Sequence, residues 1–246
     1  MTTNTNRLKY VAGTYAKRKT DTAQLANKYI KEWVKKQLNI TPTKFEPVKI
    51  PPAICFSRKI GSGAMEIADI LAEKLHYRVL DRELLHYMAK DAEISKATLI
   101  FFDQRYPGKM SELASRLFGN KSFIMSDFIQ NLVSAVFTFA DMGSTIFVGR
   151  GIHLFLPRDR VLAVRVICSD HTRIKRIAKN LDLEEKAVQK ILNQVDEEQS
   201  DYFQKAFGKQ EASPYEFDIV LNCDFVSSPH GAAEILAKTF QEKFRT

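Results

Sequence analysis

A glycine-rich stretch near residue 60 carries the residue types best suited to chemistry. An apolar run ends at Ser57, and Gly61-Ser62-Gly63 then leads into a stretch with helical periodicity. Glycines let a backbone bend sharply and bring its N–H groups close to phosphate oxygens, while a helix N-terminus adds the positive end of its dipole. The same residues also suit an ordinary strand-to-helix turn. The strands and helices predicted around it favour the phosphate-binding alternative.

A second cluster of this kind is Gly149-Arg150-Gly151, which follows an apolar run of strand length. In open α/β sheets, ligands bind beyond the carboxyl ends of parallel strands. A guanidinium at that position can bind a phosphate or stabilise charge during its transfer. Arg150 is therefore a candidate catalytic residue.

The elements that must position these residues alternate along the chain. Strand-length runs rich in Val, Ile and Phe occur at Ala53–Ser57, Arg78–Leu80, Thr145–Gly149, Val161–Cys168 and Phe217–Asn222. Helical patterns occur at Ala64–Leu75, Arg82–Lys90, within Met110–Met142, and at His171–Asn180, Leu183–Phe203 and His230–Phe244. This alternation predicts a three-layer α/β fold with a five-stranded parallel sheet and right-handed helical crossovers.

The basic charge of the chain is concentrated before residue 51. The net charge is +8, and residues 1–50 hold 11 Lys and Arg against 3 Asp and Glu, so that residues 51–246 are balanced. There is no apolar run long enough to span a bilayer, and the N-terminus has polar residues where a secretory signal would be apolar. We therefore expect a soluble, cytoplasmic protein with no membrane partner.

Residues 1–50 form a basic N-terminal extension in this interpretation, and residues 51–246 form the main domain. A helix is predicted from Asp21, with Tyr29 and Trp33 on its apolar stripe, followed by a proline-rich connector over 39–52. With its lysine flanks the stripe suits a nucleic acid or an anionic surface, or it docks on the main domain or a second subunit. The three cysteines, Cys55, Cys168 and Cys223, are expected to be buried free thiols.

The loop and the segments after it resemble the cytidylate-kinase-like family. The resemblance is carried by Ser57-Arg58-x-x-Gly61-Ser62-Gly63, Glu66-Ile67-Ala68, Leu71–Leu75, Val79-Leu80-Asp81, Val148–Gly151 and Tyr215–Asn222. It covers roughly residues 53–242. It implies a P-loop kinase fold with a helical lid, and a nucleotide-binding phosphotransferase that uses ATP and Mg²⁺.

The loop departs from cytidylate kinase at the positions that handle charge. That enzyme has a Lys just before the helix and a Ser or Thr two positions later, where this chain has Ala64 and Glu66. Met65 stands where the divergent family usually has an Arg. The resemblance leaves Arg58 and Lys59 as the loop's own positive candidates, with Arg58 either binding phosphate or forming a surface ion pair. Glu66 is a candidate Mg²⁺ ligand. The predicted phosphate-binding residues are Ser57, Lys59, Gly61, Ser62, Gly63, Ala64 and Met65.

Further positions of the resemblance concern the acceptor and the lid. Asp81 either faces the acceptor or caps the next helix. An expected arginine is replaced by Tyr87, and an aspartate that helps recognise the nucleotide is replaced by Gly151. Arg173 and Arg176 fit the helix that enters the lid, or are solvated helix charges. An expected Asp-x-x-Arg pattern reads Asp196-Glu197-Glu198-Gln199.

Two functions follow from these observations. In the first, the chain transfers the γ-phosphoryl group of ATP to a nucleoside monophosphate or another small acceptor, with Arg58 and Arg150 as catalytic residues. In the second, it is a catalytically inactive protein that binds a nucleotide or a partner and lacks the P-loop lysine. Neither the acceptor nor the oligomeric state follows from the sequence.

Overall fold

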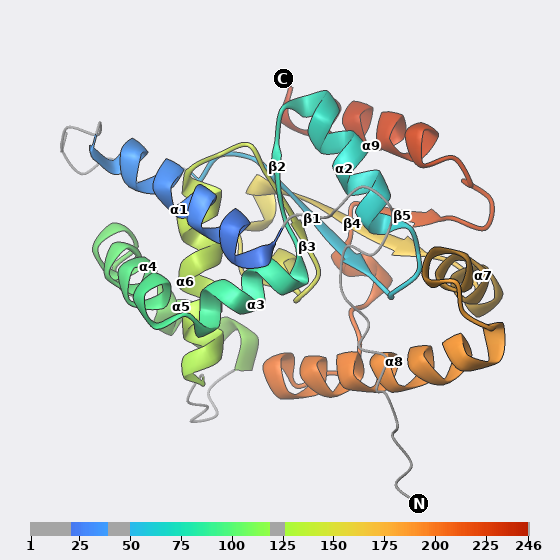
Figure 1. Cartoon of the computed structure of the whole chain (residues 1–246). Coiled ribbons are helices and arrows are strands. Elements are labelled where there is room, and N and C mark those ends of the chain that lie inside the picture. The colour runs from blue at the N-terminus through green and yellow to red at the C-terminus, as the bar shows by residue number, and fades with distance from the viewer. Residues whose placement is uncertain (1–20, 39–49, 119–125, 246) are drawn as a thin grey trace, which may run out of the picture.

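A five-stranded parallel sheet lies at the centre of the computed structural model, which describes residues 21–38, 50–118 and 126–245 (Figure 1). In these residues the strands are β1 (Ala53–Arg58), β2 (Arg78–Leu80), β3 (Thr145–Val148), β4 (Val161–Ile167) and β5 (Ile219–Asn222), in the order β2-β3-β1-β4-β5. All pairings are parallel, which confirms the predicted sheet. Residues 39–49 of the predicted connector lie outside the described residues.

Helices cover both faces of this sheet and so form the three predicted layers. They are α1 (Thr22–Leu38), α2 (Ala64–Leu75), α3 (Arg82–Lys90), α4 (Ala92–Arg105), α5 (Lys109–Phe118), α6 (Asp127–Asp141), α7 (Asp170–Leu181), α8 (Glu185–Phe207) and α9 (Pro229–Phe244). The helix α4 was not predicted from the sequence, and α5 and α6 were predicted as one long helical stretch. The start of α4 depends on Asp91, whose carboxylate accepts from the amides of Glu93 and Ile94.

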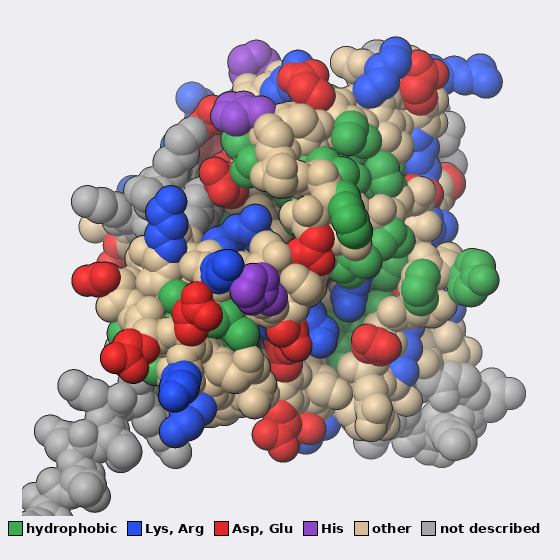
Figure 2. Space-filling view, turned by 90° about the vertical axis from the view of Figure 1, so that its right-hand side faces the viewer, with side chains coloured by type: hydrophobic (Ala, Val, Ile, Leu, Met, Phe, Trp, Pro, Cys, Tyr) green, Lys and Arg blue, Asp and Glu red, His purple; other side chains and the backbone are tan. Residues whose placement is uncertain are grey.

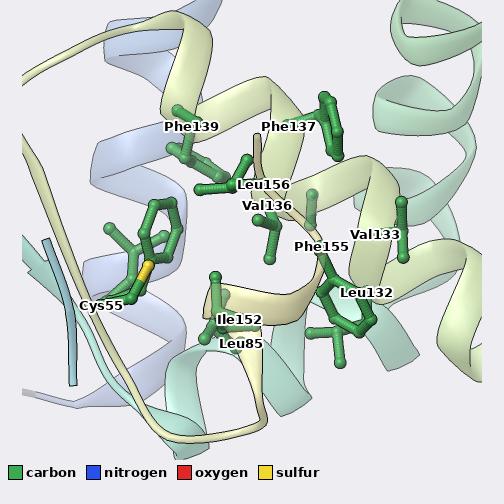
Figure 3. Packing of buried hydrophobic residues seen from close by; sticks show 14 of the residues in the cluster. Cys55, Leu85, Leu132, Val133, Val136, Phe137, Phe139, Ile152, Phe155 and Leu156 are labelled. Atoms are coloured by element: carbon green, nitrogen blue, oxygen red, sulfur yellow. The ribbon is translucent and has the colours of Figure 1, made fainter. Parts of the chain in front are cut away.

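The hydrophobic core has two parts, one on each face of the sheet, because successive residues of a strand point to opposite faces. On β1, Ile54 and Phe56 face α2 and α9, whereas Cys55 faces the α3–α6 side. Figure 3 shows that second cluster, to which Cys55 of β1 and Phe137 and Phe139 of α6 belong. Cys55 and Cys223 are buried as expected, and Cys168 is half-buried. The two apolar layers hold β1 rigidly, and β1 in turn positions the glycine-rich loop at its carboxyl end.

The pair α7 and α8 lies at the place of the predicted lid, and α8 runs past the carboxyl ends of the strands (Figure 1). Two side chains one turn apart on α8 bind there: Gln199 Nε2 donates to the carbonyl of Arg58 at 2.9 Å, and the Tyr202 hydroxyl donates to the carbonyl of Arg150 at 3.2 Å. Apolar contacts of Ile60 with α7 and α8 add to this attachment. In this structure α8 is therefore packed directly against the candidate site.

Helix α1 docks on the main domain through its aromatic stripe. Trp33 is buried and meets Phe101 edge-on, with ring centroids 5.5 Å apart, and Tyr29 lies 6.5 Å from Phe139. Lys36 adds a 2.9 Å bond to the carbonyl of Met142. Of the two predicted roles for this stripe, docking on the domain is the one observed. None of the described helices combines the length and apolar character needed to cross a membrane.

The face on which β5 and α7 lie carries charges of both signs (Figure 2). Lys and Arg side chains are interspersed with Asp and Glu, and hydrophobic side chains gather in one region. β5 is the edge strand, and Val220 on it, Ile167 on β4 and Phe225 just beyond β5 are exposed. No single-sign field of the kind that attracts a polyanion dominates the face that is drawn.

Candidate functional site

The glycine-rich loop turns sharply between β1 and α2. Gly61 and Gly63 have φ of +83° and +87°, a region that side chains other than glycine rarely adopt. A Cβ on Gly61 would also lie 3.0 Å from Ile177 and 3.1 Å from Arg173. Gly63 then caps α2, and the first helical bond runs from the Ile67 amide to its carbonyl at 3.2 Å. The predicted strand, loop and helix are confirmed, with the N-terminus of α2 at the carboxyl edge of the sheet.

Arg176 of α7 lies directly against this loop. Its Nη1 donates to the carbonyl of Gly61 at 2.8 Å, across 115 residues of sequence. A Cβ built on Gly63 would lie 2.9 Å from the same nitrogen and 3.0 Å from Cζ. The guanidinium therefore occupies the space beside Gly63, next to the start of α2. Arg176 thus brings a positive charge from α7 to the start of α2.

Arg173, one turn earlier on α7, is a buried anchor. Nε donates to the carbonyl of Ile60 at 2.7 Å, Nη1 donates to Asp170 and Asp196, and Nη2 donates to Asp196 at 2.6 Å. These bonds raise the pKa of Arg173 against the opposing effect of burial. Lys59 lies 3.5 Å from the same Asp196 carboxylate and has a half-exposed side chain. Asp196 of α8 thus holds both α7 and the loop, so Arg173 has a structural role in this arrangement.

Some of the other predicted loop residues lie in the hydrophobic core, and others lie at the loop itself. Ala64 and Met65 are buried against the α2–α9 side of the sheet, and Arg58 is buried at the end of β1. Ser57 Oγ accepts from Arg165 at 2.7 Å. Ser62 Oγ is buried and has no hydrogen-bond partner among the described residues. Glu66 is half-buried in the first turn of α2.

Arg150 lies in an aromatic cluster after β3, with φ of +58°. Its Cζ is 4.5 Å from the ring centroid of Tyr202 and 5.9 Å from that of Phe128, and its Nη2 is 3.3 Å from His86 Nδ1. Burial and the charge of Arg150 lower the pKa of His86 to about 4, so this imidazole is neutral near pH 7 and can accept the bond. Arg150 Nε is buried without a hydrogen-bond partner in the described structure.

Asp81 acts as the helix cap that was one of its two predicted roles. Its Oδ1 accepts from the Leu84 amide at 2.9 Å, at the start of α3, and the side chain is buried. Burial, Asp81 and Glu73 together raise the pKa of Asp69 on α2 to about 7. Asp69 gave no signal in the sequence, because an aspartate on an amphipathic helix normally faces solvent. The acceptor role of Asp81 stays a prediction.

Gly151 is required by packing as well as by its φ of +68°. A Cβ there would lie 2.6 Å from the ring of Phe207 and 3.4 Å from that of Phe203, both on α8. The aspartate of cytidylate kinase therefore has no room at this position. Nearby on α8, Gln199 stands in for the expected arginine and uses its amide on the Arg58 carbonyl, as described above. Both departures from the family pattern coincide with contacts that hold α8 close to the sheet.

The structure gathers the predicted residues into two groups, which meet α8 at successive turns through Asp196 and Tyr202. Arg176 and Lys59 lie at the loop, whereas Arg150 lies with His86 and Tyr202 beyond β3. A cavity of about 210 Å³ adjoins the loop, lined by Lys59, Arg165, Asp196, Gln199, Ser200, Phe203, Gln210, Glu211 and Ala212. Among the described residues, three or more His, Cys, Asp or Glu side chains do not come together in a way that could hold a metal ion.

Comparisons with solved structures give matches in fold. In fold, the chain is similar to an uncharacterised protein from Eubacterium ventriosum, with a TM-score of 0.58, 18% identity, and coverage of 78% of this chain and 98% of that one. Weaker similarities are to shikimate kinase from Bacteroides thetaiotaomicron (TM-score 0.39, 14% identity, coverage 79% and 99%) and to TT1252 from Thermus thermophilus (0.41, 16%, 79% and 98%).

No match is found among curated proteins. The sequence does match the model of the cytidylate kinase-like family over residues 53–224, which is most of the chain. The match includes the glycine-rich loop, Arg150, Arg176 and β5. This chain belongs to the cytidylate kinase-like family.

Proposed function

We propose that this chain is a nucleotide-binding phosphotransferase that moves the γ-phosphoryl group of ATP to a nucleoside monophosphate or another small acceptor. The observation that carries the proposal is the glycine turn at Gly61 and Gly63, which places the N-terminus of α2 at the carboxyl end of the central strand β1. Backbone amides and the helix dipole favour a phosphate at such a position. Membership of the cytidylate kinase-like family supports the same proposal.

The loop residues fit a bound nucleotide phosphate. The first amides of α2 have no intrahelical acceptor, and Ser62 Oγ is a buried group without a partner in the described structure. A bound Mg²⁺ supplies further neutralisation of phosphate oxygens, and Glu66 is the residue we propose as its ligand from this chain. The contribution of the protein is to hold the donor phosphates on loop amides and to place positive side chains around them.

Arg150 is the residue we propose for the transferred or accepting phosphate. Its guanidinium is held by Tyr202 and His86, so its orientation is fixed before a ligand arrives. Its Nε has no hydrogen-bond partner in the described residues, and a guanidinium presents two nitrogens at once to a phosphate. Burial lowers the pKa of Arg150, yet an arginine remains charged at physiological pH.

A second candidate function, nucleotide binding without catalysis, is favoured by the contacts of α8. The loop has no lysine at Ala64, and removing one preorganised positive group typically lowers a rate by about 10²–10³-fold. Gln199 bonds the Arg58 carbonyl, and Phe207 packs on Gly151, so α8 lies where lid arginines would act in a kinase. A protein built in this way binds a nucleotide as a sensor and transfers nothing.

One experiment separates the two functions. Purified protein is mixed with ATP, Mg²⁺ and a panel of nucleoside monophosphates, and binding by calorimetry is measured together with ADP production. Turnover that falls in Arg150→Ala and Arg58→Ala supports the kinase proposal and its residues. Arg105→Ala is the matched control, because Arg105 lies on α4, on the far side of the molecule from α7 (Figure 1). Binding without turnover supports the sensor function, and absence of binding contradicts both.

A further inference from the structure

The phosphate loop lacks a lysine of its own, but a positive group from another helix lies against it. We propose that Arg176 of α7 supplies the charge that cytidylate kinases carry on the P-loop lysine. This inference rests on the proposed function, since it assumes that the loop binds a nucleotide phosphate. It goes beyond that function by naming the residue that makes binding possible without the lysine.

The position of Arg176 is the first argument. Its Nη1 is 2.8 Å from the carbonyl of Gly61, and the Cβ position of Gly63 is 2.9 to 3.2 Å from Nη1, Cζ and Nη2. Ala64, at the place of the lysine, is the next residue after Gly63, so the guanidinium lies within one residue of that place. A guanidinium has several N–H donors, and the bond to Gly61 uses one of them.

Two other cations near the loop, Arg173 and Lys59, have carboxylate partners. Arg173 uses Nε, Nη1 and Nη2 on the Ile60 carbonyl and on Asp170 and Asp196. Lys59 is 3.5 Å from Asp196, which partly neutralises it. Arg176 differs from both because no hydrogen bond or ion pair joins it to a carboxylate among the described residues. Its bond to the Gly61 carbonyl orients the guanidinium without neutralising it.

Helix α7 is held firmly enough to preorganise this charge. Arg173 fixes one side of the helix to the loop, and Ile177 packs in the same apolar cluster as Ile60. At its N-terminus, the Asp224 carboxylate accepts from the Ser169 amide at 2.7 Å and from the Thr172 hydroxyl. A charge fixed in this way needs little reorganisation when phosphate binds, which is the condition for strong electrostatic stabilisation.

The charge of Arg176 also reaches the neighbouring loops after β4 and β5. Hydrogen bonds from Thr172 and Ser169 lower the pKa of Asp224, and the charge of Arg176 adds to this effect. The same charge opposes the burial that raises the pKa of Cys168 and of Cys223. Arg176 therefore lies between the glycine loop and the ends of β4 and β5. A nucleotide whose phosphate is bound at the loop would extend along this carboxyl edge of the sheet. A side chain at the position of Arg176 would then contact that phosphate.

The test removes the charge of Arg176 and then introduces a lysine on the loop at Ala64. ATP affinity is measured by calorimetry for wild type, Arg176→Gln, Arg176→Lys, and the double variant Arg176→Gln with Ala64→Lys. We expect Arg176→Gln to weaken binding about tenfold or more, since charge-assisted bonds to phosphate are among the strong ones. Arg176→Lys should retain part of the affinity, and Ala64→Lys should restore part of what Arg176→Gln loses. Lys175→Gln is the matched control, because Lys175 is the exposed neighbour on the same helix.

The outcomes distinguish this inference from the proposed function. If wild type binds ATP and Arg176→Gln binds it equally well, the inference is overturned while the proposed function stands. If wild type binds no nucleotide, the proposed function is overturned as well. Thermal unfolding of each variant identifies a merely structural role, since such a role would lower the melting temperature in Arg176→Lys and Arg176→Gln alike. Should Ala64→Lys prevent folding because Ala64 is buried, the comparison of Arg176→Lys with Arg176→Gln still decides.

Discussion

The ring of Tyr202 lies 4.5 Å from the guanidinium carbon of Arg150, while its hydroxyl donates to the carbonyl of the same residue at 3.2 Å. Tyr202 thus holds both the side chain and the backbone of a residue whose φ is +58°. Since Tyr202 is on α8 and Arg150 follows β3, this pair attaches α8 to the segment that follows β3.

The two contacts of Tyr202 can be separated by substitution. Tyr202→Phe keeps the ring over the guanidinium and removes the hydrogen bond, so the free energy of unfolding should fall by about 1 kcal/mol. Tyr202→Ala removes both contacts and leaves a cavity, and the fall should be about 3 kcal/mol. Urea denaturation measures both. Equal losses in the two variants would show that the ring contributes nothing.

Gly151→Ala should destabilise the protein by about 2 kcal/mol or more, because the new Cβ would collide with the ring of Phe207. Gly208→Ala is the control: Gly208 has the same φ of +68° but no atom within 4 Å of its Cβ position. The difference between the two variants isolates the collision from the backbone strain. Adding Phe207→Ala to Gly151→Ala should recover part of the loss, and strict additivity would contradict the contact.

Stability should depend on pH through Asp69. Burial and the neighbouring carboxylates Asp81 and Glu73 raise its pKa to about 7, above that of the unfolded chain. The folded protein therefore retains a proton that the unfolded chain releases. The contribution of Asp69 is fully present below about pH 4 and is lost as the pH rises through about 7.

Asp69→Asn removes that dependence. At about pH 8 the variant should be more stable than wild type by about 1 kcal/mol, a value reduced for partial solvent screening, and the difference should shrink toward about pH 5. Chemical denaturation across this range measures it. Parallel curves for the two proteins would contradict the assigned pKa. Asp103→Asn, an exposed change on α4, is the control.

The thiols should react slowly and in a fixed order. Burial raises the pKa of Cys168 to about 11, so little thiolate exists near neutral pH. Alkylation of Cys168 by iodoacetamide should accelerate about tenfold per pH unit between about pH 7 and 10. Cys55, with 1% of its surface exposed, should stay unmodified in the folded protein. Mass spectrometry of peptides follows both residues, and rapid labelling of Cys55 would mean that the core opens.

Strands and helices with a clear pattern of apolar residues were predictable from the sequence. Elements whose position depends on a capping residue or a tertiary contact at one end were not. The strand β4 was predicted because it is a nearly continuous apolar run of strand length, and the helix α9 was predicted because its apolar residues recur at helical spacing. The helix α4 was missed because its apolar residues spread around the helix, and its start is set by the Asp91 cap. The predicted last strand begins two residues late, at Ile219, because Phe217 turns toward His153, with ring centroids 4.7 Å apart.

The candidate site was predictable only where its residues are close in the sequence. Gly61 and Gly63 identified the loop because a short glycine pattern determines a turn. The contact of Arg176 with Gly61 spans 115 residues, and it depends on Arg173 anchoring α7, which no local pattern reports. The α8 contacts of Gln199 and Phe207 are likewise tertiary, so their effect on the site could not be derived from residue spacing.

The contact between Gly151 and Phe207 also makes substitutions at these two positions epistatic. Cytidylate kinases have an aspartate at the position of Gly151. In this chain the Cβ of an aspartate there would lie 2.6 Å from the Phe207 ring, so that substitution alone should destabilise the fold. A smaller residue at position 207 has to be in place before the carboxylate fits. The order of the two substitutions therefore decides whether a base-binding carboxylate can be introduced at this position.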